Sequence, residues 1–282
     1  MPVMDFWKMN GAGNDFIILD NRSGQIPRER FPELARVLCR RRLSIGADGL
    51  MVVERPQGDA DYRMTFYNAD GSLGEMCGNG ARCVCRFGYE QGLAGEVQRV
   101  ETTAGLVTGA RIDRRTYRVR LNTPSVVGLD RTVSVDGIGW PCAYVELGNP
   151  GVPHAVVQME GLRTRPQEEL RELGRKLRGH STFPKGANVN FYEPCGTDAV
   201  YLRTYERGVE DFTYACGTGA GSTVTVLTLQ GAVSGRGVRV ATDGGVLVID
   251  AERRGDGIEA LFLTGPTNTV ARGTVTDESL FP

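Results

Sequence analysis

The stretch Cys77-Gly78-Asn79-Gly80-Ala81 returns later in the chain as Cys216-Gly217-Thr218-Gly219-Ala220. The two copies lie 139 positions apart (216 − 77), and the same spacing places Thr65 on Thr204. In each copy a strand-like run leads through a polar turn to a cysteine, and Gly-x-Gly-Ala then opens a helical segment. The sequence therefore predicts an internal duplication in which each half carries one cysteine at the start of a helix.

The duplication extends beyond the two cysteine motifs. Gly46-Ala47-Asp48 matches Gly186-Ala187-Asn188 at a spacing of 140 (186 − 46). His154 falls on Asp15 at a spacing of 139 (154 − 15). Matches in several separate places favour two similar lobes over a single-sheet fold.

Each half is expected to form a lobe of its own. The predicted fold class is α/β (α+β), with two pseudo-symmetric lobes, each a mixed β-sheet or barrel around a central helix. The active site is expected in the cleft between the lobes. The predicted lobes are residues 1–122 with 268–282, which carry Cys77, and residues 123–267, which carry Cys216.

Hydrophobic periodicity predicts short strands and four helices. The helices are expected at residues 30–42, 79–90, 170–177 and 218–230. Arg40 to Arg42 would form the solvated last turn of the first helix, and Thr164 is a possible cap of the third. The fourth is rich in Thr and Val, which are poor helix formers, so we expect a buried position where packing stabilises it. Strands are expected within 6–20, 50–53, 62–67, 97–103, 106–112, 116–121, 144–157, 200–205, 238–241, 246–249 and 259–263, with a returning strand or tail from about 268.

Composition and charge exclude several classes of protein. A chain of 282 residues with a formal charge of −1 does not suit a general nucleic-acid or polybasic membrane role. No stretch approaches the roughly 18 apolar residues of a membrane span, and no secretory signal is visible. Seven cysteines lack the density of a disulfide scaffold. We therefore expect a cytoplasmic protein whose partner is a small molecule, not a nucleic acid or a membrane.

A cysteine placed just before a helix has its sulfur near unpaired backbone N–H groups and the positive end of the helix dipole. That position favours the thiolate, and the same N–H groups can hold a carboxylate. A single such cysteine could be a nucleophile, a redox thiol or a core residue. Two of them facing one cleft suit a two-base racemisation, in which one thiolate removes the α-proton of an amino acid and the opposite thiol protonates the other face.

No cofactor or metal is expected for this chemistry. The lysines Lys8, Lys176 and Lys185 lie in no context that suggests a Schiff base with pyridoxal phosphate, and the cysteine spacing does not form a zinc site. The glycine-rich run 217–222 carries Ser where a dinucleotide loop needs its third Gly. A Cys–His hydrolase could use His154, but it would leave the second cysteine motif unexplained.

The chain resembles the diaminopimelate epimerase family over nearly its full length. That family is cofactor-independent and interconverts LL- and meso-diaminopimelate in bacterial lysine and cell-wall synthesis. The resemblance implies a homodimer. It rests on motifs at Lys8-Met9 with residues 11–16, and at residues 46–49, 68–72, 75–83, 206–208 and 215–220.

The resemblance also implies roles for individual residues. Cys77 and Cys216 would be the two acid–base thiols. Gly78, Asn79, Gly217 and Thr218 would surround the α-carboxylate of the substrate. The remaining implied substrate-binding residues are Asn14, Asn68, Asn149, His154, Asn188, Glu206 and Arg207.

One segment departs from the family pattern. Where members usually have Gly-Asn-Pro-His, this chain has Gly-Asn-Pro-Gly-Val-Pro-His at residues 148–154. Either Asn149 keeps its role and three residues are inserted, or Val152 takes the position and a contact is lost. Gly49 also stands where some members carry Gln.

Three functions therefore stay open at this point. The first is epimerisation of diaminopimelate, which Asn68, Asn188 and Arg207 favour. The second is racemisation of another amino acid, such as histidine, proline or hydroxyproline, by the same two thiols, which the altered segment before His154 favours. The third is a non-catalytic amino-acid binder or a phenazine-type isomerase of the same fold, against which the presence of both cysteines argues.

Overall fold

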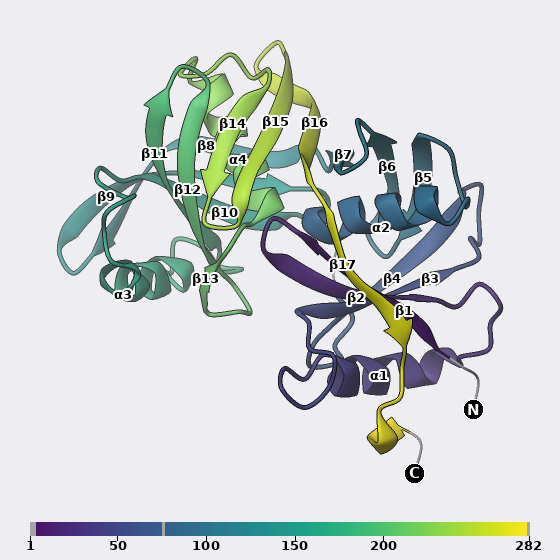
Figure 1. The fold of residues 1–282 in the computed structure, drawn as a ribbon. Coiled ribbons are helices and arrows are strands. Elements are labelled where there is room, and N and C mark those ends of the chain that lie inside the picture. Colours follow the sequence, from purple (N-terminus) through teal and green to yellow (C-terminus); the bar gives the residue numbers. More distant parts are fainter. Residues whose placement is uncertain (1–3, 75–76, 281–282) are drawn as a thin grey trace. The chain divides into compact units, whose positions relative to one another are not determined.

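The computed structural model describes residues 4–74 and 77–280. Glu75 and Met76, which belong to the first cysteine motif, lie outside the described residues, as do residues 1–3 and 281–282 of the predicted first lobe. The chain divides into two compact units (Figure 1). Unit 1 is Met1–Val119 with Gly265–Pro282, and unit 2 is Arg120–Thr264. The lobe boundaries that the sequence predicts, after residues 122 and 267, stay a prediction.

The strands of unit 1 pair in the order β17-β1-β2-β3-β4-β5-β6-β7. The β2–β3 and β4–β5 pairs are parallel and the others are antiparallel. Helix α1 (Phe31–Leu38) connects β2 to β3, and α2 (Gly78–Glu90) lies between β4 and β5. The strands are β1 (Asp5–Gly11), β2 (Asn14–Asp20), β3 (Gly49–Glu54), β4 (Tyr62–Asn68), β5 (Val97–Thr102), β6 (Gly105–Arg111), β7 (Thr116–Leu121) and β17 (Asn268–Thr274).

Helices α1 and α2 cover opposite faces of β2 and β3 (Figure 1). Alternate residues of these strands, such as Ile17 and Leu50, form a core with α1. On the other face, α2 approaches so closely at Gly80 that a side chain there would overlap Met51. Because both faces are covered, β3 is buried along its whole length, as is usual for strands in parallel pairs.

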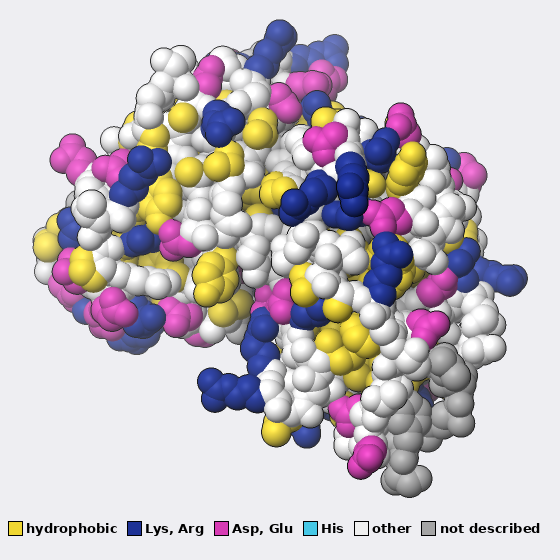
Figure 2. Space-filling model, in the orientation of Figure 1, with side chains coloured by type: hydrophobic (Ala, Val, Ile, Leu, Met, Phe, Trp, Pro, Cys, Tyr) yellow, Lys and Arg dark blue, Asp and Glu magenta, His cyan; other side chains and the backbone are white. Residues whose placement is uncertain are grey.

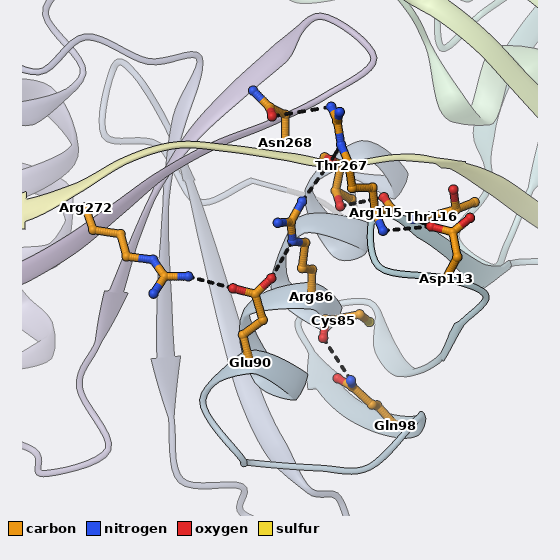
Figure 3. Close-up of polar contacts among 10 residues, drawn as sticks. All are labelled: Cys85, Arg86, Glu90, Gln98, Asp113, Arg115, Thr116, Thr267, Asn268 and Arg272. Atoms are coloured by element: carbon orange, nitrogen blue, oxygen red, sulfur yellow. Dashed lines mark hydrogen bonds and ion pairs between the residues drawn. The ribbon is translucent and has the colours of Figure 1, made fainter.

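Strand β17 joins the C-terminal part of the chain to α2 and β1. It pairs antiparallel with β1, and Figure 3 shows the polar contacts that fix its start. Arg86 of α2 donates to the Thr267 carbonyl at 3.0 Å, while Glu90 pairs with both Arg86 at 2.7 Å and Arg272 at 2.6 Å. Arg115 donates to the side chain of Asn268 at 3.3 Å. These contacts hold the start of β17 against α2, although the two segments are far apart in the sequence.

Unit 2 follows the same pairing pattern. Its strands pair in the order β9-β10-β11-β12-β14-β15-β16. The β10–β11 and β12–β14 pairs are parallel and the other four are antiparallel, which is the same series as from β1 to β7. Helix α3 (Gln167–Arg178) connects β10 to β11, and α4 (Gly217–Leu229) lies between β12 and β14. The strands are β8 (Pro124–Val135), β9 (Ile138–Leu147), β10 (Val152–Gln158), β11 (Asn188–Gly196), β12 (Ala199–Glu206), β13 (Asp211–Thr213), β14 (Val238–Thr242), β15 (Gly245–Arg254) and β16 (Gly257–Pro266).

The predicted fold class, a mixed α/β protein, is confirmed. The buried position predicted for the Thr- and Val-rich helix is also confirmed, because α4 is buried along most of its length and packs on β9, β10, β11 and β15. Within residues 4–74 and 77–280, no helix is long and apolar enough to cross a membrane. Figure 2 shows Lys and Arg side chains interspersed with Asp and Glu on the visible face, in agreement with the near-zero charge.

Two local predictions are wrong. The first helix ends at Leu38, so Arg40 to Arg42 follow it in a turn, where Arg41 forms ion pairs with Asp15 at 2.6 Å and Asp48 at 2.8 Å. These carboxylates offer Arg41 a better partner than the end of a helix dipole does. The N-cap of α3 is Pro166 rather than Thr164, whose hydroxyl donates to the Gly161 carbonyl at 3.2 Å within the preceding turn.

Candidate active site

The two motif cysteines occupy the same position in their helices. Cys77 is the N-cap of α2, with φ −105° and ψ 113°, and Cys216 is the N-cap of α4, with φ −108° and ψ 111°. Each helix has 13 residues, and each cysteine carbonyl accepts the first helical bond, from Ala81 at 2.8 Å and Ala220 at 2.9 Å. The duplication visible in the sequence therefore gives two thiols with matching backbone geometry.

Cys216 is held in a buried setting. Its sulfur accepts the backbone N–H of Gly219 at 3.3 Å and lies 3.5 Å from the Thr218 hydroxyl. Burial raises the pKa of the Cys216 thiol well above its ordinary value, and the Glu206 carboxylate raises this pKa further. At neutral pH, Cys216 is therefore a protonated thiol that can give up a proton.

Cys77 is partly exposed and adjoins a chain of amides. Asn79, in the first turn of α2, is buried and donates from Nδ2 to Oδ1 of Asn14 at 2.6 Å. Asn14 in turn donates to Asp48 at 3.2 Å. On the other side, Oδ1 of Asn79 accepts from Nη2 of Arg82 at 2.9 Å. Two of the predicted substrate contacts, Asn14 and Asn79, are thus brought together beside Cys77.

Asn68 lies at the same end of the strands as Asn14. Strand β2 begins at Asn14, the parallel strand β3 begins at Gly49, and the antiparallel strand β4 ends at Asn68, which pairs with Gly49. The side-chain amide of Asn68 is exposed and donates to the Ser72 hydroxyl at 3.0 Å. Gly49 has no room for a side chain, because an added Cβ would lie 2.7 Å from the Tyr67 carbonyl.

The other predicted polar residues gather at the matching end of unit 2. Asn188 begins β11 and pairs with His154 of β10. Its Oδ1 accepts the backbone N–H of Arg207 at 2.8 Å, just after the end of β12. One nitrogen of the Arg207 guanidinium donates to the Lys185 carbonyl at 3.0 Å. The neighbouring carboxylate of Glu206 accepts the Thr213 hydroxyl at 2.6 Å.

His154 is completely buried, so it is packed behind the residues that solvent can reach. Nδ2 of Asn190 lies 3.2 Å from its Nδ1, and its Nε2 has no hydrogen-bond partner in the part of the chain that is described. Burial lowers the pKa of His154 to about 3, and the charge of Arg207 contributes to the same shift. The imidazole is therefore neutral at physiological pH, and a direct contact between His154 and substrate stays a prediction.

The altered segment forms a turn between β9 and β10. Val152 is the first residue of β10 and pairs with Leu147, so residues 148–151 make the turn itself. Asn149 is exposed in this turn, whereas Val152 holds the strand position two residues before His154. Asn149 lies in the turn that precedes β10, at the end of the sheet where the parallel strand β11 also begins, and its role in binding stays a prediction.

Sequence reasoning missed several residues beside these sites. Asp48 orients Asn14 by accepting its side-chain amide, and Thr213 orients Glu206 by donating its hydroxyl to the carboxylate. Arg82 belongs to the first cysteine motif, yet the motif alone gave it no role. Among the described residues, no cluster of three or more His, Cys, Asp or Glu side chains could hold a metal ion.

Comparison with solved structures identifies known proteins that share this fold. The chain matches a hydroxyproline epimerase from Agrobacterium vitis with a TM-score of 0.71 and 20% identity, covering 99% of this chain and 94% of that one. It also matches a protein of the phenazine biosynthesis PhzF family from Enterococcus faecalis, with a TM-score of 0.68 and 10% identity, covering 97% and 99%. At these identities the matches establish the shared fold.

The sequence comparisons define the family. The family model described as diaminopimelate epimerase matches residues 6–127 and 147–270. A diaminopimelate epimerase from Aquifex aeolicus is 39% identical, covering 98% of this chain and 99% of the relative. Another from Methanothrix thermoacetophila is also 39% identical, covering 99% of both chains. The chain therefore belongs to the diaminopimelate epimerase family, whose members are isomerases.

Proposed function

We propose that this protein converts LL-2,6-diaminopimelate into meso-diaminopimelate without pyridoxal phosphate or a metal, and that Cys77 and Cys216 are its acid–base pair. Family membership supports the reaction. The observation that carries the mechanism is the matched geometry of the two N-cap cysteines, whose φ and ψ angles agree within a few degrees. We further propose that the protein works in the cytoplasm as a homodimer. Sedimentation velocity would measure the mass of the assembly.

The reaction requires one base and one acid on opposite faces of the substrate α-carbon. In one direction, the thiolate of one cysteine takes the α-proton, and the C–H electron pair moves toward the α-carboxylate. The thiol of the other cysteine then delivers its proton to the opposite face and becomes the new thiolate. The first-turn N–H groups of α2 and α4 suit the α-carboxylate, because they can stabilise the charge that develops on its oxygens.

The polar residues at the strand ends supply groups for the rest of the substrate. A distal carboxylate calls for a guanidinium and amide donors, which Arg207, Asn14 and Asn68 provide. An ammonium group calls for carboxylate or carbonyl oxygens, and Glu206 provides a carboxylate. The guanidinium and amides therefore fit an amino acid that has a second carboxylate at its far end, while Glu206, which acts on Cys216, suits the ammonium group beside the reacting carbon.

A second candidate function is racemisation of a different amino acid by the same thiols. The enlarged turn of residues 148–151 favours it, because a ligand for the distal end of diaminopimelate is lost if Val152 takes the position that Asn has in the family. Candidates include histidine, proline and hydroxyproline. Both candidate functions use the same two cysteines and differ only in the far end of the substrate.

Deuterium incorporation at Cα from D2O tests both candidates. Purified protein would be incubated with LL-diaminopimelate, meso-diaminopimelate, histidine, proline and hydroxyproline, and the label measured by mass spectrometry and NMR. We expect exchange with the two diaminopimelate isomers and its loss in Cys77→Ala and in Cys216→Ala. Exchange with only another amino acid would select the second candidate, and no exchange with any substrate would overturn both.

A further inference from the structure

Arg82 is a fully buried cation in the helix that begins after Cys77. It is the fifth residue of α2, and its side chain is 0% exposed. The side chain points back along the helix, as helical side chains do. Its Nη1 donates to the Gly78 carbonyl at 3.4 Å and its Nη2 to Oδ1 of Asn79 at 2.9 Å. The guanidinium therefore lies against the first turn that follows Cys77.

Among the residues that the structure describes, no carboxylate forms an ion pair with this guanidinium. Across residues 4–74 and 77–280, Arg82 forms no ion pair, and its Nε has no hydrogen-bond partner. Arg86, one turn further along the same helix, pairs with Glu90 and donates to the Thr267 carbonyl (Figure 3). A buried cation without a counter-charge is strongly unfavourable, so Arg82 calls for an anion nearby.

Among the described groups around Arg82, Cys77 is left as the source of that anion. Burial lowers the pKa of Arg82 to about 10, so the guanidinium keeps its charge at neutral pH, and the thiols whose charge would act on it are Cys77, Cys83 and Cys85. Burial raises the pKa of Cys83 and of Cys85 to about 12, so both stay neutral. On α2 and the strands packed against it, Lys8 of β1 pairs with Asp15 of β2, Arg111 of β6 with Glu96, and Arg86 with Glu90. Asp20, the last residue of β2, pairs with Arg22, and Asp5, the first residue of β1, accepts from the Thr274 hydroxyl.

The second half of the duplication has the opposite arrangement. At the spacing of 139 (221 − 82), Arg82 falls on Gly221. A Cβ added at Gly221 would lie 2.9 Å from Leu121 and 3.0 Å from Leu261, so apolar side chains occupy the place of the cation. The charge that acts on Cys216 is instead the carboxylate of Glu206. The two thiols thus share backbone geometry but have neighbours of opposite sign.

We propose that Arg82 is a positioning residue whose buried guanidinium holds Cys77 as the thiolate of the resting enzyme, while Cys216, beside Glu206, rests as the thiol. The catalytic meaning of this arrangement rests on the function proposed above. Cys77 then starts as the base and Cys216 as the acid. The isomer whose α-proton faces Cys77 reacts without a prior transfer of a proton between the cysteines.

The pH dependence of alkylation tests the charge assignment without any substrate. Cys77 would be alkylated by iodoacetamide in a Cys216→Ala background, and its modification followed by peptide mass spectrometry from pH 5 to 10. We expect Arg82→Met to raise the pH midpoint by about one unit, which makes alkylation at neutral pH about tenfold slower. Arg82→Lys should restore much of the rate. Arg86→Met, which removes a paired arginine from the same helix, should leave the midpoint unchanged.

An unchanged midpoint in folded Arg82→Met, or an equal shift in Arg86→Met, would overturn the proposal.

A second comparison needs no Arg82 variant, so it does not depend on whether Arg82→Met folds. In the Cys216→Ala and Cys77→Ala backgrounds, the midpoint of Cys77 should lie at least about two units below that of Cys216, and Glu206→Gln should speed alkylation of Cys216. Equal midpoints would overturn the proposal. Absence of Cα exchange with these alkylation results intact would sink the proposed function alone.

Discussion

The side chain of Asn79 joins Asn14 to Arg82, since its Nδ2 donates to Asn14 at 2.6 Å while its Oδ1 accepts from Arg82 at 2.9 Å. Asn79 is 1% exposed, so water cannot replace either partner. We therefore expect Asn79→Ala to lower the free energy of unfolding by about 1–3 kcal/mol. It should also lower kcat/KM for diaminopimelate by about tenfold, because Asn14 is no longer fixed.

Urea denaturation and the Cα exchange assay measure these two effects. Thr164→Ala is a suitable control, because its hydroxyl bond to Gly161 is exposed and its loss should change stability by less than about 0.5 kcal/mol. Equal stability of Asn79→Ala and the wild type would show that the bonds to Asn14 and Arg82 contribute nothing.

Gly219 brings the N-terminus of α4 close to the strands and to the sulfur of Cys216. An added Cβ would overlap Oδ1 of Asn190 and lie 3.0 Å from the Thr204 hydroxyl. We expect Gly219→Ala to lower the free energy of unfolding by about 1–3 kcal/mol and to slow exchange, since its N–H donates to Cys216. Gly58→Ala, where a Cβ meets open space, is the matched control. Similar denaturation midpoints for the two variants would contradict this packing.

The structural elements differ in how well the sequence predicts them. The helices after Cys77 and Cys216 were predictable, because Gly-x-Gly-Ala recurs at a fixed spacing and gives each half the same start signal. Strand β8 was missed. Its first half is largely exposed, with only Val133 and Val135 buried, and two register shifts interrupt its pairing with β9, so it lacks a regular alternation of apolar residues.

The burial of Arg82 could not be predicted either. An arginine in a helix is usually exposed, and only the packing of α2 against β1, β2 and β6 shows that this one is enclosed. The ion pairs of Arg41 could not be predicted either, because its partners Asp15 and Asp48 come from other segments of the chain. Side-chain partners of this kind depend on the tertiary fold, whereas helix start signals are local.

His154 should make the protein sensitive to mild acid. Its pKa is about 3 in the folded state, below the ordinary value of 6.5, so the unfolded state binds a proton first as the pH falls. The stabilisation is present above about pH 6.5 and is lost below it, by about 2 kcal/mol between pH 7 and pH 5. Urea denaturation at both pH values, for the wild type and for His154→Gln, measures this loss. A loss just as large in His154→Gln would assign the acid sensitivity to other groups.

The central claim is that one thiol removes the α-proton and the other protonates the opposite face. The most direct measurement is the early conversion of unlabelled LL-diaminopimelate in D2O, with substrate and product separated before analysis. Two separate thiols predict one deuterium at the inverted Cα of the meso product and none in the recovered LL-isomer, with conversion lost in Cys77→Ala and in Cys216→Ala. Deuterium in the recovered LL-isomer at the same early times, or conversion that continues in either variant, would contradict the account.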